Sequence, residues 1–152
     1  MDIAEVMKNE IDCAVQWWSQ QLRQKTQHKT GDLFNDAIMH LVLDMIASKA
    51  IPDEQVSLFE ESLRIGIIKL IEDAGIDVND PPAGSYHRVV STDYSPDEVL
   101  STALSTANIN DGGYRLPMKT IMWINPGAVS VAQGYNVQSI TIYSVQDVTN
   151  EH

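Results

Sequence analysis

The stretch from residue 116 to residue 143 reads LPMKTIMWINPGAVSVAQGYNVQSITIY. Three runs within it, at residues 120–124, 129–132 and 139–143, are rich in β-branched residues, and turn sequences separate them. In the last two runs valine or isoleucine alternates with other, mostly polar residues, which is typical of strands with one buried and one solvated face. The stretch therefore predicts an antiparallel β-meander.

A fourth strand and a short helix are predicted immediately before the meander. Residues 85–91, SYHRVVS, have the composition of a strand. In the sequence Ser95-Pro96-Asp97-Glu98, we expect the serine to cap a helix, the proline to occupy its first position and the glutamate to complete a capping box. This helix is expected to continue to Ala107, and residues 110–113, NDGG, are expected to turn the chain.

Three helices are predicted in the first half of the chain, at residues 2–29, 32–49 and 51–74. Apolar residues recur there at steps of three and four, which is the period of an amphipathic helix. Trp18 continues the apolar stripe of the first helix, whereas Trp17 lies about 100° away and is either half-buried or an exposed anchor. Gly66 lies inside the third helix, where glycine costs about 1 kcal/mol of helix stability relative to alanine. A close crossing with another helix would explain a glycine at this position.

The predicted fold class is α+β. We expect three amino-terminal helices packed on an antiparallel sheet of about four strands, with one further short helix. A single domain is expected over residues 1–152, with a helical half at 2–75, a mixed strand-helix-strand half at 85–144 and a loose tail at 145–152. One shared core is the expectation because either half alone would be small.

Composition limits the functions that the chain can have. Its 152 residues include 21 Asp and Glu and 10 Lys and Arg, giving a formal net charge of −11, which disfavours generic binding to nucleic-acid phosphates. The one cysteine, Cys13, excludes an intrachain disulfide and suits a reducing, cytoplasmic setting. The amino terminus lacks a signal-peptide pattern, and no stretch has the apolar length of a membrane span.

Sequence motifs for catalysis or metal binding are missing. The four histidines, at positions 28, 40, 87 and 152, form no HExxH-type pair, and one cysteine cannot form a CxxC motif. There is no G-x-S-x-G elbow. The glycine-containing loops at 83–85 and 111–113 match neither the P-loop nor the dinucleotide fingerprint. We therefore expect a binding protein that is not an enzyme and uses no metal or cofactor.

The meander stretch resembles the second conserved box of the BTG/Tob antiproliferative family. The shared positions, in order, are Leu116, Pro117, Thr120, Trp123, Pro126, Val129, Ser130 and Gly134. Upstream, PPAGSYHRVV resembles the first box, and SPDEVLSTALSTANI resembles the helix between the boxes. Asn125 stands where the family has an aspartate, Ala132 stands where it has an arginine, and the family's His-Trp-x-Pro-Glu stretch is missing.

The resemblance implies a BTG/Tob-like fold and a non-enzymatic adaptor. In that family both boxes form a surface that docks a deadenylase subunit of the messenger-RNA decay machinery. Trp123, Arg88 and Asn125 are the positions that would carry such a surface here, on an exposed apolar patch. The missing first-box tryptophan leaves the identity of the protein partner open.

Two other functions remain open from the residues. One is a phage-type inhibitor of host defence that sequesters a nucleotide signal, like anti-Thoeris and anti-CBASS sponges. In it Arg88, Arg115 and Lys119 would neutralise phosphates at one sheet edge, and a tyrosine would stack on the base. The stacking candidates are Tyr86, Tyr114 and Tyr135. Such binders place their pockets between protomers, so a homo-oligomer is expected. The other function is an acidic inhibitor that mimics DNA, which rests on the net charge alone.

Overall fold

The structure is a computed structural model that describes residues 2–23, 37–38, 41, 50–134 and 137–145. Its helices are α1 (Ile3–Val6), α2 (Lys8–Arg23), α4 (Asp53–Ala74), α5 (Glu98–Thr106) and α6 (Gly112–Arg115), with the 3-10 turn η1 at Ser85–His87. Its strands are β1 (Val89–Thr92), β2 (Thr120–Asn125), β3 (Ala128–Gln133) and β4 (Ile140–Ser144). The predicted α+β class with a four-stranded antiparallel sheet is confirmed. The helix expected at 32–49 lies almost entirely outside the described residues.

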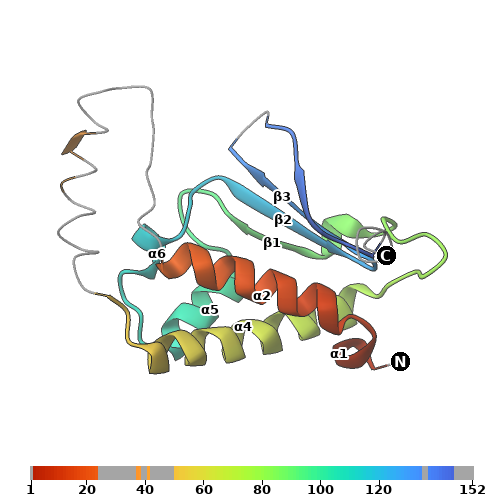
Figure 1. The fold of residues 1–152 in the computed structure, drawn as a ribbon, viewed down its shortest axis with the longest axis horizontal. Helices are drawn as coiled ribbons and strands as arrows, with labels where there is room; N and C mark the ends of the chain where they lie inside the picture. The colour runs from red at the N-terminus through yellow and green to blue at the C-terminus, as the bar shows by residue number, and fades with distance from the viewer. Residues whose placement is uncertain (1, 24–36, 39–40, 42–49, 135–136, 146–152) are drawn as a thin grey trace, which may run out of the picture.

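The sheet is a meander in which neighbouring strands are consecutive in the chain, in the order β1-β2-β3-β4. Its register places Met122 opposite Val90 on one side and opposite Val131 on the other. All three side chains are buried, as are Ile124 and Val129. Because side chains alternate along a strand, these residues define the inner face of the sheet, and Figure 1 shows α2, α4 and α5 on one side of it.

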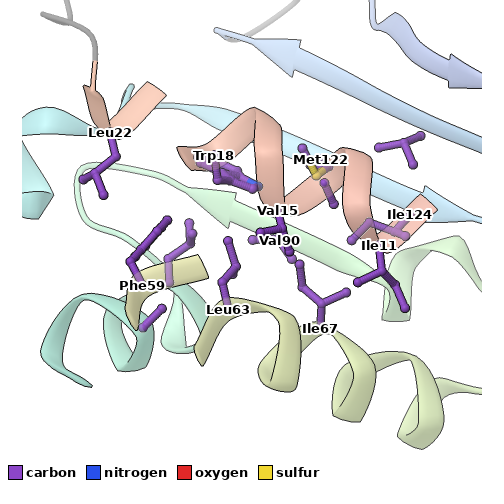
Figure 2. Close-up of a cluster of buried hydrophobic side chains, with 14 of the residues drawn as sticks. Ile11, Val15, Trp18, Leu22, Phe59, Leu63, Ile67, Val90, Met122 and Ile124 are labelled. Atoms are coloured by element: carbon purple, nitrogen blue, oxygen red, sulfur yellow. The ribbon is translucent and has the colours of Figure 1, made fainter. Parts of the chain in front are cut away.

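Two long helices form the layer that covers the inner face. Helix α2 contacts β2, β3 and β4, and helix α4 packs on α2 and α5. The predicted apolar stripes are buried there, with Trp18, Phe59, Leu63 and Ile67 fully inaccessible. Figure 2 shows the α2 and α4 side chains meeting Val90, Met122 and Ile124 of the sheet. Burying such a side chain contributes about 1.5–3 kcal/mol, so this cluster is the main stabilising element.

The first helix is divided, which corrects the single helix expected from residue 2. Helix α1 is capped by Asp2, whose carboxylate accepts a hydrogen bond from the Ala4 amide at 3.1 Å. It ends at Met7, which leaves helical geometry at φ −110° and ψ 28°. Met7 is fully buried, so the break places its side chain in the same core as the stripe of α2.

The segment before β1 is a turn, which corrects the start of the strand expected at 85–91; its last three residues lie in β1. Gly84 has a φ of 75°, in the left-handed region that favours glycine, and it opens the 3-10 turn. The amide of His87 donates to the Gly84 carbonyl at 3.0 Å, and extended pairing starts at Val89. Residues 110–113 are also not a simple turn, because Gly112 begins the short helix α6.

Helix α5 is capped by Asp97, which corrects the cap expected at Ser95. One carboxylate oxygen of Asp97 accepts from the Leu100 amide at 2.9 Å, and the other accepts from the Ser91 amide at 2.8 Å. The Asp97 amide in turn donates to the Ser91 carbonyl at 2.9 Å. Burial raises the pKa of the Asp97 carboxyl above its ordinary value. This one side chain therefore joins the start of α5 to the edge of β1.

The last strand differs in part from the alternation expected for it. Val129 and Val131 of β3 are buried as predicted, but Ile140 is 68% exposed and Ile142 is half-buried. The register between β3 and β4 shifts between Val129 and Ser130. A β-bulge of this kind interrupts the two-residue period, so the alternation along β4 does not map onto one buried face.

Candidate interaction surface

The outer face of the sheet carries Trp123 near its centre. Trp123 pairs with Val89 of β1 and with Ser130 of β3. It is half-buried, and Ile121, two residues earlier on the same face, is 37% exposed. Because α2, α4 and α5 lie on the opposite side of the sheet (Figure 1), no described helix of this layer covers the indole.

This face also lacks charge. The sequence from Thr120 to Ser144, which forms β2, β3 and β4, contains no Asp, Glu, Lys, Arg or His. The whole chain has a net charge of −11, so its acidic residues all lie outside these three strands. Protein interfaces have cores that are depleted in charged residues and enriched in aromatic residues, and the outer sheet face lacks charge along these strands and carries Trp123.

Arg88 lies inside the protein, which corrects its expected place on an outward surface beside Trp123. It is 1% exposed, and its guanidinium donates at 2.8–3.0 Å to four backbone carbonyls and one amide side chain. The carbonyls belong to Gly75, Pro81, Ala83 and Ile124. Burial lowers the pKa of Arg88 from its ordinary value. Its role is to tie the 75–83 loop to the ends of β1 and β2.

Asn125 is the side-chain partner of Arg88. Its Oδ1 accepts from Nη2 of Arg88 at 2.9 Å. Asn125 is half-buried at the end of β2. The resemblance implied that Arg88 and Asn125 share an outward docking surface; in the structure they contact each other inside the fold.

The other two candidate cations, Arg115 and Lys119, interact with side chains away from Arg88. Nε of Arg115 donates to Oδ2 of Asp111 at 2.9 Å, and Arg115 is buried. The ammonium of Lys119 lies 5.1 Å from the ring centroid of Tyr94. Lys119 precedes β2, whereas Arg88 lies opposite its last residues, which is a separation of roughly 16 Å along a strand. The three cations therefore do not share one sheet edge.

The candidate aromatic residues are dispersed. Tyr86 is exposed in η1, near the Arg88 end of the sheet. Tyr135 and the side chain of Tyr114 lie outside what the structure describes. Tyr94, at the opposite end, is exposed and was missed by sequence reasoning, although its position before Ser95-Pro96 in a turn is a signal for exposure.

Trp17 flanks the last strands from the helical side. Its ring contacts Trp18 edge to face, with centroids 4.8 Å apart and an interplanar angle of 87°. It is half-buried and lines a pocket of about 160 Å³ together with Val131, Val137, Ile140 and Ile142. The indole is thus a partly covered edge residue, the first of the two alternatives left open by the sequence.

The described residues were compared with the requirements of a metal site and of a reactive thiol. No group of three or more His, Cys, Asp or Glu side chains among them is placed to hold a metal ion. Cys13 is half-buried, its Sγ lies 3.9 Å from the Ile142 carbonyl, and burial raises the pKa of its thiol. Among the described helices, none has both the length and the apolarity needed to cross a bilayer.

An open antiparallel sheet with helices on one side and an uncharged outer face that carries a tryptophan has features found in protein interfaces. The model of the BTG family matches residues 34–143 of the chain. The chain belongs to the BTG family, and the resemblance seen at residues 116–143 is confirmed.

A solved relative supports the same fold. The FOG-3 BTG/Tob domain from C. elegans superposes with a TM-score of 0.56, covers 88% of each chain and is 19% identical in sequence. At this identity the likeness concerns the fold alone. No curated protein matches the sequence significantly.

Proposed function

We propose that the outer face of the sheet docks a protein partner, with Trp123 as its central anchor. The observation that carries the proposal is the indole on an uncharged face that the described helices leave uncovered. Tryptophan is among the residues that contribute most to binding free energy when a partner covers them. Ile121 and Val89 lie beside it on the same face and would exclude water from the contact.

The partner class that the family resemblance favours is a subunit of an RNA-decay nuclease, in particular a deadenylase subunit. In this expectation Trp123, Arg88 and Asn125 carry the docking surface. Because Arg88 is buried, we propose that Trp123 and Ile121 contact the partner directly. Arg88 and Asn125 then stabilise the end of the sheet. The proposed binding function is non-catalytic.

The test compares partner binding by Ile121→Glu on the outer sheet face and Ile65→Glu on the exposed side of α4, two matched isoleucine substitutions. Ile121→Glu places a charge on the outer sheet face, and Trp123→Ala removes the proposed anchor. We expect each to weaken capture of a purified deadenylase subunit at least tenfold, since an anchor residue contributes about 2 kcal/mol or more. Ile65→Glu, on the exposed side of α4, is the control and is expected to leave capture unchanged.

Binding would be measured by calorimetry, with circular dichroism showing that each variant is folded. If the wild-type protein captures neither this subunit nor any protein from a lysate of its own organism, the docking proposal fails. If Ile121→Glu and Ile65→Glu weaken capture equally, the docking surface has been misplaced.

No observation favours the nucleotide-sequestering alternative. Arg88 is saturated by internal acceptors, Arg115 pairs with Asp111, and Lys119 lies at the other end of β2 from Arg88. The homo-oligomer expected with that function, and the DNA-mimicking inhibitor, remain predictions from the sequence.

A further inference from the structure

Helices α4 and α5 cross closely and leave an open groove between them. The crossing point is Gly66, where an added Cβ would lie 3.0 Å from Cγ1 of Val99. The close crossing suggested by a glycine inside the helix is thereby confirmed. The groove has a volume of about 480 Å³. Its walls are Ser62, Ile65, Lys69, Leu70 and Asp73 of α4 and Glu98 and Thr102 of α5.

Apolar side chains on the exposed side of α4 continue this groove. Ile65 lines it and is 63% exposed, and Leu58, seven residues earlier on the same helical face, is 45% exposed. Ile65 lies about 200° round the helix from the buried Leu63, at 100° per residue. It therefore faces away from the core and from the sheet, and α4 carries a second apolar stripe with no role in the described packing.

The surroundings of this stripe are strongly acidic. Helix α4 contains six carboxylates and two cations, and α5 contains one carboxylate and no cation. Glu61 and Glu72 lie four and seven residues from Ile65 on the same face, and Asp73 and Glu98 lie in the groove walls. Of the two cations, Arg64 forms an ion pair with Asp12 of α2, which leaves Lys69 as the cation in the groove wall.

We propose that this groove binds an amphipathic helical segment of a partner protein, with aliphatic side chains over Ile65 and Val99 and flanking Lys or Arg side chains toward the carboxylates. An apolar stripe with charged borders is the recognition surface for such a helix. Charge complementarity selects a basic segment, since a second copy of this acidic chain or an acidic helix would be repelled. The groove lies between α4 and α5, which cover one side of the sheet, and Trp123 lies on the other side of the sheet (Figure 1), so two partners can bind at once.

The probe is a synthetic amphipathic peptide of leucine and lysine, about 14 residues or roughly 21 Å of helix. Methyl NMR of the whole protein would follow Ile65, Leu58 and Val99 during titration. We expect saturable shifts at these methyl groups and none at Ile121. A peptide with glutamate in place of lysine, and a scrambled leucine-lysine peptide without an apolar face, are expected to bind at least tenfold more weakly.

The variant Ile65→Glu separates specific docking from simple charge attraction. It removes the apolar anchor but adds a negative charge, so docking in the groove predicts binding at least tenfold weaker, whereas unspecific attraction predicts binding that is unchanged or stronger. Ile121→Glu is the matched control with the same added charge, and binding of the peptide is expected to persist. The proposal is overturned if Ile65→Glu binds the peptide as well as Ile121→Glu does, or if no saturable shifts occur in the groove.

The experiment is independent of the sheet-face proposal. Loss of deadenylase capture in Ile121→Glu with intact peptide binding supports both surfaces. Peptide binding without any capture of a partner at the sheet face supports the groove and rejects the first proposal.

Discussion

Nη2 of Arg88 donates a hydrogen bond to Oδ1 of Asn125 over 2.9 Å, and this contact closes the end of the sheet where β1 begins and β2 finishes. The same guanidinium holds carbonyls of the 75–83 loop. Among the described residues, no carboxylate pairs with Arg88. The buried positive charge is therefore stabilised by dipoles alone, which makes two substitutions informative.

Replacing Arg88 is expected to destabilise the fold strongly. Arg88→Ala leaves several buried carbonyls without a donor at about 1 kcal/mol or more each, so we expect a loss of about 3–5 kcal/mol in the free energy of unfolding. Arg88→Lys is expected to recover little of this loss, because an ammonium lacks the fork of five donors. Urea denaturation followed by circular dichroism measures both.

The control for Arg88 is Arg23→Ala on the surface. Arg23 pairs with Asp53 at 3.2 Å in an exposed setting, and such pairs contribute about 1 kcal/mol or less. A loss for Arg88→Ala no larger than the loss for Arg23→Ala would show that the buried network is not a main support of the fold.

Asn125→Asp is expected to stabilise the protein by about 1 kcal/mol near neutral pH, because the new carboxylate would form an ion pair with the buried guanidinium of Arg88, where the wild type has a hydrogen bond to a neutral amide. Arg88 would depress the pKa of the introduced carboxylate below its unfolded value of about 3.9. The added stability is therefore present above that pH and is lost as the pH falls through the depressed folded pKa.

Chemical denaturation at a series of pH values tests this substitution. Asn79→Asp, in an exposed loop without a cation partner among the described contacts, is the matched control and is expected to give no gain. A similar effect of the two substitutions would contradict a specific contact with Arg88.

Sequence periodicity predicted those features that depend on local order. The steps of three and four located the stripes that bury Trp18 and Leu63, and the alternation at Val129 and Val131 located the inner face of β3. The residues around Trp123 left its burial open, and its outward place was implied by the family resemblance; in the structure it is half-buried on the face opposite Met122 and Ile124.

Features that depend on distant contacts were not predictable. Arg88 looks like a surface cation in the sequence, and its burial follows from carbonyls that the loop at 75–83 brings to it. Ser95 and Asp97 both suit a helix cap, and the choice of Asp97 depends on the nearby amide of Ser91 in another element. The groove beside Ile65 required the positions of two helices that are separate in the sequence.

Asp97, the cap of α5, can be tested by substitution. Asp97→Asn replaces one of two accepting oxygens with a donor, so the amide of Ser91 or of Leu100 loses its partner. We expect a loss of about 1–3 kcal/mol at pH 7. Ser95→Ala, at the cap position expected from the sequence, is the control and is expected to change stability by less than about 0.5 kcal/mol.

The pH dependence of Asp97→Asn follows from the raised pKa of Asp97. Between the unfolded value of about 3.9 and the higher folded value, the native state binds more protons, so this group's contribution to stability falls as pH rises. The wild-type advantage over Asp97→Asn should therefore narrow as pH increases through this window. An advantage that widens with pH would mean that the backbone hydrogen bonds outweigh burial.

Gly66 offers a test of the helix crossing that forms the floor of the groove. Alanine is favoured over glycine inside a helix by about 1 kcal/mol. The added methyl of Gly66→Ala would lie 3.0 Å from Cγ1 of Val99, a contact so tight that the valine side chain or α5 must shift by a few tenths of an ångström. We expect the unfavourable contact to outweigh the higher helix propensity of alanine, so that Gly66→Ala lowers the free energy of unfolding.

A double-mutant cycle with Val99→Ala isolates this contact. Val99→Ala removes the opposing methyl groups, so adding Gly66→Ala in that background is expected to stabilise the protein by about 1 kcal/mol, the full helix propensity difference. Gly75→Ala is the control. Its φ of 78° disfavours alanine whatever space surrounds it, so this substitution is expected to destabilise the protein with either valine or alanine at position 99. If Gly66→Ala has the same effect with valine and with alanine at position 99, the two helices do not meet at this glycine.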